Sequence, residues 1–206
     1  MAKLGTADWR CASTSTRRDS SPMRAYVIAC ANTGATVRAP GARVCPGTVP
    51  DVEQSLPVVT IRHAEAADHA RVSPRLDAWW GGRAMGAMLP RLFFEHFRDT
   101  SFVAEEEGEL VGFLCGFLSQ TYPDQAYVHF VGVRPDHRGG GLGRELYERF
   151  FGTVRAAGRD VVRCVTGPVN EGSIAFHRRL GFEIEAKVAD YDGAGEARVL
   201  LRKRLS

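Results

Sequence analysis

The residues best suited to chemistry lie in a glycine-rich segment, residues 131–143, which reads V-G-V-R-P-D-H-R-G-G-G-L-G. An apolar run leads into the glycines, and apolar residues at helical spacing follow them. Glycines leave the backbone N–H groups at a helix N-terminus unshielded, and the helix dipole favours negative charge there. The segment therefore predicts a strand, a phosphate-binding loop and a helix. A glycine-rich turn without a ligand is the simpler alternative.

Two commoner phosphate-binding loops do not fit the spacing. A dinucleotide fingerprint G-x-G-x-x-G that starts at Gly139 would need glycine where Arg144 stands, and one that starts at Gly141 would need glycine at Leu146. A P-loop needs Gly-Lys-Ser/Thr after its glycines, and no lysine lies near. The spacing therefore disfavours an oxidoreductase that binds a dinucleotide.

A second segment, residues 170–182, reads N-E-G-S-I-A-F-H-R-R-L-G-F. Together, the two segments resemble the two central motifs of the GCN5-related N-acetyltransferase (GNAT) superfamily, and the resemblance covers about the last three quarters of the chain. It implies an α/β (α+β) fold with a mixed, mostly antiparallel central sheet and helices on both faces. It also implies acetyl-CoA as the co-substrate.

The resemblance assigns coenzyme binding to both motifs. In that family the first motif binds the pyrophosphate, the strand before it hydrogen-bonds the pantetheine arm, and the second motif lies beside the thioester. The matching residues are Val131, Gly132, Val133, Arg138, Gly139, Gly140, Gly141, Leu142, Gly143, Arg144, Asn170 and Ser173. Asn170 and Ser173 are also typical helix-capping residues, and Gly132 is equally compatible with close packing.

The chemistry implied is direct attack of a neutral primary amine on the thioester in a ternary complex. It needs a polarised carbonyl, a base and a proton for the departing thiolate. A backbone N–H at Val131 or Gly132 would polarise the carbonyl. Many family members carry Tyr where this chain has His177, so His177 is predicted to protonate the thiolate. A polar residue without a catalytic role is the alternative.

His129 is the predicted base. It alternates with Val131 and Val133 and should therefore share their face of the strand. A hydrogen-bonded structural histidine is the alternative. Other residues could act through water, and nothing in the sequence ranks them: Glu95, His96, Tyr122, Asp124 and Asp192.

Strands and helices must alternate to position these residues. Strands are predicted at residues 58–62, 101–105, 110–118, 126–133, 161–165, 182–188 and 197–201. Helices are predicted at residues 64–80 and 88–97, from Leu142 to a stop at Gly158, and at residues 172–180. Two aromatic pairs, Trp79–Trp80 and Phe93–Phe94, fall where the family builds its acceptor wall, although core packing is the alternative.

The chain is predicted to contain one folded domain, residues 57–206, after a disordered leader, residues 1–56. The leader has little apolar periodicity, so it cannot offset the entropy of ordering. It carries seven Lys/Arg and four Asp/Glu, which accounts for the whole net charge of +3 and leaves the domain neutral. This balance argues against a nucleic-acid-binding domain. A transit peptide and a start at Met23 are both open, and the second is favoured.

The remaining composition predicts a cytoplasmic enzyme without a metal. No membrane-spanning run is present, and no cysteine spacing indicates zinc. Cys115 and Cys164 are predicted to be small buried side chains. The acceptor, a small molecule or a peptide amine, carries no motif, and a homodimer stays open. The alternative from another class is a non-catalytic acyl-CoA-binding or regulatory module, which the missing Tyr favours.

Overall fold

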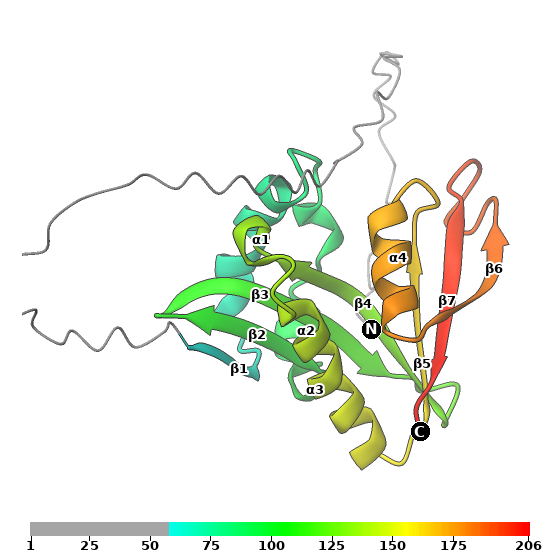
Figure 1. Cartoon of the computed structure of the whole chain (residues 1–206), viewed down its shortest axis with the longest axis horizontal. Helices are drawn as coiled ribbons and strands as arrows, with labels where there is room; N and C mark the ends of the chain where they lie inside the picture. Colours follow the sequence, from blue (N-terminus) through cyan, green and yellow to red (C-terminus); the bar gives the residue numbers. More distant parts are fainter. Residues whose placement is uncertain (1–57) are drawn as a thin grey trace, which may run out of the picture. The chain divides into compact units, whose positions relative to one another are not determined.

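A computed structural model of the chain describes residues 58–206, and the prediction for the leader lies outside the described residues. Figure 1 shows a twisted sheet flanked by helices. The strands are β1 (Val59–His63), β2 (Ser101–Glu106), β3 (Glu109–Leu118), β4 (Gln125–Val133), β5 (Val161–Thr166), β6 (Glu183–Val188) and β7 (Arg198–Arg204). The helices are α1 (Asp68–Trp79), α2 (Leu92–Glu95), α3 (Leu142–Ala156) and α4 (Glu171–Arg179), with 3₁₀ turns η1 (Gly86–Met88), η2 (Arg98–Thr100) and η3 (Pro135–His137).

The sheet has the order β1-β2-β3-β4-β5-β7-β6, and every neighbouring pair is antiparallel except β4 with β5. This confirms the predicted mixed, mostly antiparallel sheet. The parallel pairing covers only Gln125–Tyr127 against Val161–Arg163, although both strands continue beyond it. Beyond Tyr127 the two strands therefore diverge, and the edge of β4 that faces β5 has no strand partner in the described part of the chain (Figure 1).

Side chains on the two faces of the sheet form separate cores. The α3 core combines Leu146 and Phe150 of α3 with Val128 of β4. The α1 core combines Leu76 of α1 with Phe113 of β3 and with residues of α2. Burial of each such large apolar side chain contributes about 1.5–3 kcal/mol, so these two layers determine where the helices lie.

A β-bulge interrupts the pairing of β3 with β4. Cys115 pairs with Phe130, whereas the next residue of β3 pairs with Val128, so His129 is an additional residue on β4. A bulge sets two successive residues against one, and the alternation of side chains changes phase there. Val128 and Val131 accordingly contact the α3 core, while His129 and Phe130 lie on the side of the α1 core.

The predicted helix over residues 88–97 is wrong in extent. The chain forms η1 and then α2, a single helical turn. Pro90 separates them, and Leu89 before it is extended, with φ −109° and ψ 90°, as proline favours in the residue that precedes it. The other predicted strands and helices are present, with boundaries that differ by a few residues. Within residues 58–206, no helix combines the length and the apolar character that a membrane span requires.

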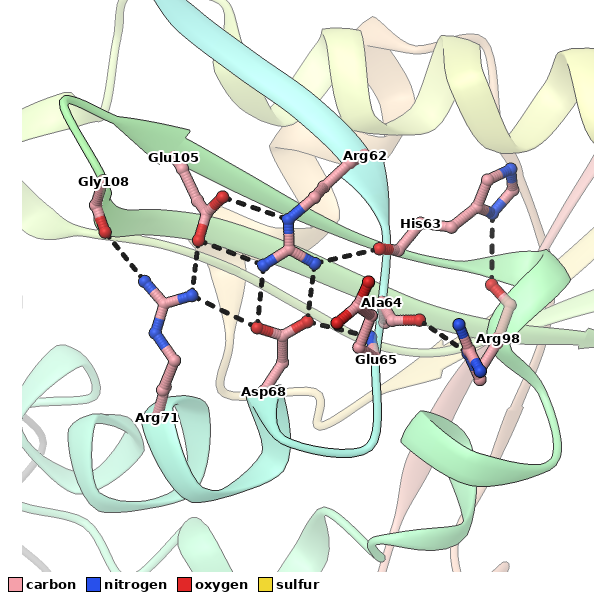
Figure 2. A network of polar contacts seen from close by, with 9 residues as sticks. All are labelled: Arg62, His63, Ala64, Glu65, Asp68, Arg71, Arg98, Glu105 and Gly108. Carbon is pink, nitrogen blue, oxygen red and sulfur yellow. Dashed lines mark hydrogen bonds and ion pairs between the residues drawn. The ribbon is translucent and has the colours of Figure 1, made fainter.

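A closed network of two arginines and two carboxylates joins β1, β2 and the start of α1 (Figure 2). The Arg62 guanidinium donates to Asp68 at 2.7 and 2.9 Å and to Glu105 at 3.0 and 3.1 Å. Arg71 donates to both carboxylates and also to the Gly108 carbonyl oxygen at 2.8 Å. Because Asp68 is only 2% exposed, its charge depends on these donors.

The network holds both carboxyl groups ionised. Burial opposes ionisation of Asp68, but hydrogen bonds from Arg62 and from the Glu65 N–H outweigh it and lower the pKa. The hydrogen bond from Arg62 likewise lowers the pKa of Glu105. A lowered pKa in the folded state means that the stabilisation is complete above the ordinary values of 3.8 and 4.5 and is lost as the pH falls below them.

Asp68→Asn should lower the free energy of unfolding by about 2–3 kcal/mol at neutral pH, because two guanidinium groups lose a buried charged acceptor. The variant should also lose less stability than the wild type between pH 5 and pH 3, as about one linked carboxyl has been removed. Denaturant titrations over this pH range measure both effects. Asp99→Asn, at an exposed position in η2, is the matched control. Equal stability of both variants would contradict this role.

Candidate functional site

The glycine-rich loop lies where β4 ends and α3 begins, with η3 between them. Gly139 and Gly141 have φ values of 87° and 94°, in the left-handed region that side chains disfavour. A Cβ atom at either position would meet nothing within 4 Å, so the conformation rather than crowding requires glycine. The backbone that leads into the first turn of α3 is therefore bare, as an anion-binding helix N-terminus requires.

The other residues of the first motif have different surroundings. Leu142 is buried and packs in the α3 core. Arg144 is exposed on the first turn of α3. Gly143 allows close packing, since a Cβ there would lie 3.3 Å from Cζ of Phe176 on α4. Gly132 likewise contacts aromatic rings, because its Cβ would lie 2.6 Å from Trp80.

Arg138 folds back from the loop. Its Nε donates to the Val133 carbonyl oxygen at 3.0 Å, and Nη2 donates to the Trp79 carbonyl oxygen at 2.6 Å. Burial lowers the pKa of this guanidinium. Two of its three nitrogens thus bind protein carbonyls that lie on β4 and at the end of α1.

Sequence reasoning missed the contacts of His137 with Asp136 and Glu106, which join the loop to β2 and which we call the histidine clasp. His137 in η3 lies 2.9 Å from Glu106 of β2 and 2.9 Å from Asp136. Hydrogen bonds to Asp136 and Glu106 raise the pKa of His137. No local pattern indicates this contact, because Glu106 is 31 residues away in the chain. A cavity of about 290 Å³ beside the clasp is lined by Val59, Asp136, His137, Arg138, Gly140 and Leu142.

The second motif forms α4. Asn170 is the N-cap of this helix, and its side-chain oxygen accepts a hydrogen bond from the Ser173 N–H at 3.3 Å. The capping alternative for Asn170 is therefore present in the structure. Both residues lie at the N-terminal end of α4, which faces the same end of the sheet as the open fork between β4 and β5 (Figure 1).

His177 points into the protein. It is 4% exposed, and the aromatic rings of Phe176 and Phe182 meet it edge-on at 5.3 Å between ring centroids. Nδ1 lies 2.7 Å from the Ser173 carbonyl oxygen, and Nε2 lies 2.7 Å from the Tyr147 hydroxyl. A carbonyl only accepts, so Nδ1 carries the proton and Nε2 accepts from tyrosine.

This environment keeps His177 neutral. Burial lowers its pKa, and the hydrogen bond to Ser173 only partly offsets that effect. The single proton of the neutral ring is committed to a backbone carbonyl. The geometry therefore favours a structural role, in which His177 joins α4 to Tyr147 of α3, over the proton donor that the sequence predicts.

Cys115 and Cys164 are buried free thiols, as predicted. Burial raises the pKa of Cys164 to about 12 and the pKa of Cys115 further still. Both side chains are therefore thiols at neutral pH, without the exposure and thiolate character of a nucleophile.

His129 does not share a face with Val131 and Val133, and this prediction is wrong. Val131 and Val133 pack against the α3 core, whereas the His129 ring stacks on Phe93 of α2. The two ring centroids are 4.6 Å apart, and the angle between the ring planes is 9°. The bulge at His129 is the cause, because strict alternation holds only in a regular strand. His129 Nε2 lies 3.1 Å from the Met88 carbonyl oxygen of η1. Nε2 must therefore donate, which makes Nδ1 of the neutral ring a hydrogen-bond acceptor.

The other predicted bases are less well suited. Glu95 binds Arg91 at 2.6 Å, and that hydrogen bond lowers the pKa of Glu95. Asp192 is paired with Arg198 at 2.8 Å. Sequence reasoning missed Tyr127, which is the last residue of β4 to pair with β5 and stacks on Phe117. Burial raises the pKa of Tyr127.

The aromatic pairs lie in or against the α1 core. Trp79 and Phe94 are core residues of the α1 core. Phe93 is also buried but presents one face to His129. Trp80 is partly buried and packs over Gly132. One member of each pair therefore contacts β4 near the fork.

Comparisons with known proteins agree with these features. The profile of the Acetyltransferase (GNAT) family matches residues 65–182. The L-amino acid N-acyltransferase MnaT of Escherichia coli is 32% identical over 142 residues, which cover 63% of this chain and 83% of that protein. The L-2,4-diaminobutyric acid acetyltransferase of Nocardia farcinica is 36% identical over 97 residues, which cover 45% of this chain and 50% of that protein. The chain spans half or less of the length of several curated relatives that it matches.

Solved structures show the same fold. The acetyltransferase yncA of Salmonella typhimurium, determined with acetyl-CoA, has a TM-score of 0.57 and 23% identity, and covers 72% of this chain and 95% of its own. An acetyltransferase of the GNAT family from Desulfovibrio desulfuricans has a TM-score of 0.64 and 20% identity, and covers 72% of this chain and 100% of its own. On the family match, which includes both motifs and the strands β2 to β5, the chain belongs to the GNAT acetyltransferase family.

Proposed function

We propose that the protein is an N-acetyltransferase that moves the acetyl group of acetyl-CoA to the primary amine of a small molecule. The observation that carries this proposal is the fork between β4 and β5, which opens toward the bare backbone of the glycine-rich loop. A strand edge without a partner offers backbone donors and acceptors to an extended arm, and the helix N-terminus beyond it favours a pyrophosphate.

The residues at the fork fit acetyl-CoA, which would supply a reactive thioester there. The backbone of Val131 to Val133 would hold the pantetheine arm. The N–H groups from Gly139 to Arg144 would hold the pyrophosphate, because the space beside Gly139 and Gly141 is open. Asn170 and Ser173 at the start of α4 would flank the arm on its other side.

His129 is the base in this proposal. Its ring lies on the side of the sheet covered by η1 and α2, and its Nδ1 can accept a proton from an incoming ammonium group. The backbone N–H of Val131, on the edge of β4 that β5 leaves unpaired, would polarise the thioester carbonyl. The departing thiolate is a tolerable leaving group near neutral pH, so the mechanism needs no proton from His177.

The acceptor is proposed to be of amino-acid type. Relatives are named for L-amino acids, for L-2,4-diaminobutyrate and for L-methionine sulfone. Asp192 of the β6–β7 loop and Arg198 at the start of β7 form an ion pair, and both charges act on Tyr127. Such a pair can recognise both ends of a zwitterion. A cytoplasmic location completes the proposal, because buried free thiols suit a reducing compartment.

Turnover of acetyl-CoA, followed as free thiol, tests the function against L-2,4-diaminobutyrate, L-methionine sulfone, other amino acids and a peptide with a free N-terminus. Acceptor-dependent thiol release supports the proposal. Tight binding of acetyl-CoA without turnover of any amine would instead support the alternative, a non-catalytic acyl-CoA-binding module.

Gly141→Glu should weaken acetyl-CoA binding by more than about tenfold, because like charges about 4 Å apart near a protein surface repel by up to about 4 kcal/mol. The new side chain would also have to adopt a left-handed conformation. Calorimetric titration of the folded variant measures the affinity. Gly152→Glu, further along α3 with nothing within 4 Å of its Cβ, is the control and should bind like the wild type. Unchanged affinity of Gly141→Glu would exclude the loop as the pyrophosphate site.

His129→Gln should lower kcat/KM by about 10²-fold or more, because glutamine cannot take a proton from the acceptor amine. Steady-state kinetics with acetyl-CoA and the acceptor measure the effect. The matched control is His63→Gln, because His63 also contacts a backbone carbonyl, at 3.1 Å, and a phenylalanine ring, at 4.8 Å, but lies on β1. If both variants keep near-wild-type rates, His129 is structural.

His177→Ala should lower the free energy of unfolding by about 2–4 kcal/mol, because it leaves a cavity and an unpaired Tyr147 hydroxyl. The rate per folded molecule should change little. Since the folded-state pKa lies below the ordinary 6.5, stability is complete above pH 6.5 and falls as the pH decreases. His177→Gln should lose this part of the pH dependence in thermal melts. A 10²-fold drop in kcat for a fully folded variant would restore the proton-donor role.

A further inference from the structure

The last turn of α1 contacts both the glycine-rich loop and the segment that covers His129. On one side, the Trp79 carbonyl oxygen accepts a hydrogen bond from Nη2 of Arg138 at 2.6 Å. The same guanidinium donates from Nε to the Val133 carbonyl oxygen at 3.0 Å. One side chain thus joins the end of β4, the loop and α1, across 59 residues of sequence between Arg138 and Trp79.

The ring of Trp80 fixes the same turn against β4. A Cβ at Gly132 would lie 2.6 Å from Cη2 of Trp80 and 2.6 Å from Cε1 of Phe113. The indole also meets Phe130 edge-on at 5.3 Å. Only glycine at position 132 allows this close packing. A displacement of β4 at the fork would therefore also displace Trp80 at the end of α1.

Asp77 carries the contact on to η1. Its Oδ1 accepts hydrogen bonds from the Met85 N–H at 2.7 Å and from the Gly86 N–H at 2.9 Å. The chain reverses between them through Gly81 and Gly82, whose φ values are 69° and 86°. The carboxylate therefore holds the start of η1 against α1.

A hydrogen bond links η1 to His129 on β4. The Met88 carbonyl oxygen lies 3.1 Å from Nε2 of His129 and so sets the orientation of that ring. The series Arg138, Trp79, Asp77, Met88 and His129 is continuous in hydrogen bonds and helix backbone. Asp77, His129 and Arg138 are exposed residues, and each of their side chains in this series is oriented by a hydrogen bond to a backbone group.

We propose that Arg138 is a positioning residue that couples the coenzyme loop to η1, and that coenzyme binding thereby orders the wall that receives the acceptor. The inference rests on the proposed function for the identity of the two sites. Arg138 acts here through Trp79 and Val133 and not as a phosphate ligand. Two nitrogens of its guanidinium donate to two different carbonyl groups, which the single ammonium of lysine cannot reproduce.

Backbone hydrogen–deuterium exchange tests the coupling without any acceptor, with coenzyme A as the probe. In the wild type, saturating coenzyme A should slow exchange in the loop and also in residues 84–92, by about fivefold or more. Arg138→Gln and Arg138→Lys should keep the slowing in the loop at saturation but lose it in residues 84–92. Asp77→Ala, which removes the acceptor of both N–H groups, should lose it too, with a Kd for coenzyme A within about twofold of the wild type, as it lies outside the loop.

Arg144→Gln is the electrostatic comparison, because it removes the same charge from an exposed position on α3. It should weaken coenzyme A binding and reduce its dependence on salt, yet keep the slowing in residues 84–92. The proposal is overturned if Arg138→Lys behaves like the wild type while Arg138→Gln behaves like Arg144→Gln, since Arg138 would then act by charge alone. Equal slowing of residues 84–92 in every variant would also overturn it. Absence of coenzyme A binding by the wild type would instead reject the proposed function.

Discussion

The early end of the parallel pairing between β4 and β5 is the constraint on which the rest of the structure depends. The ladder stops at Tyr127 and Arg163, although both strands run on. Unpaired backbone groups on β4 need partners, and they are exposed at the point where the strand leads into the glycine-rich loop. The helices must then pack without closing the fork, and the small residues Gly132 and Gly143 allow aromatic rings to approach from either side.

The bulge at His129 determines which side chains of β4 lie on each face of the sheet at the fork. One additional residue in β4 changes the phase of alternation, so Val131 and Val133 keep their place over the α3 core while His129 turns toward α2. Without that residue, the imidazole would lie among buried aliphatic side chains. With it, the ring rests on Phe93 and contacts a backbone carbonyl of η1.

Buried polar contacts, rather than apolar area alone, set the helix positions on each face. The carboxylate of Asp68 fixes the start of α1 to two arginines, and the His177 ring joins α4 to α3 through Tyr147. Such groups are costly to bury unless every partner is present, so they select one arrangement of the helices over others of similar packing. At the motif position that many family members give to tyrosine, the His177 ring packs against Phe182 and binds Tyr147.

The sequence by itself determined the order of strands and helices, the glycine-rich loop and the buried cysteines, because periodicity, glycine and proline act over a few residues. It also carried the family motifs that predict the coenzyme site. Only the tertiary structure decided the face of His129, the inward position of His177 and the carbonyl partners of Arg138. A bulge is defined by the register of a neighbouring strand, and the partners of His177 and Arg138 lie 30 and 59 residues away. The spacing of nearby residues does not depend on such distant contacts. The sequence could therefore single out these side chains as candidates but could not assign their roles.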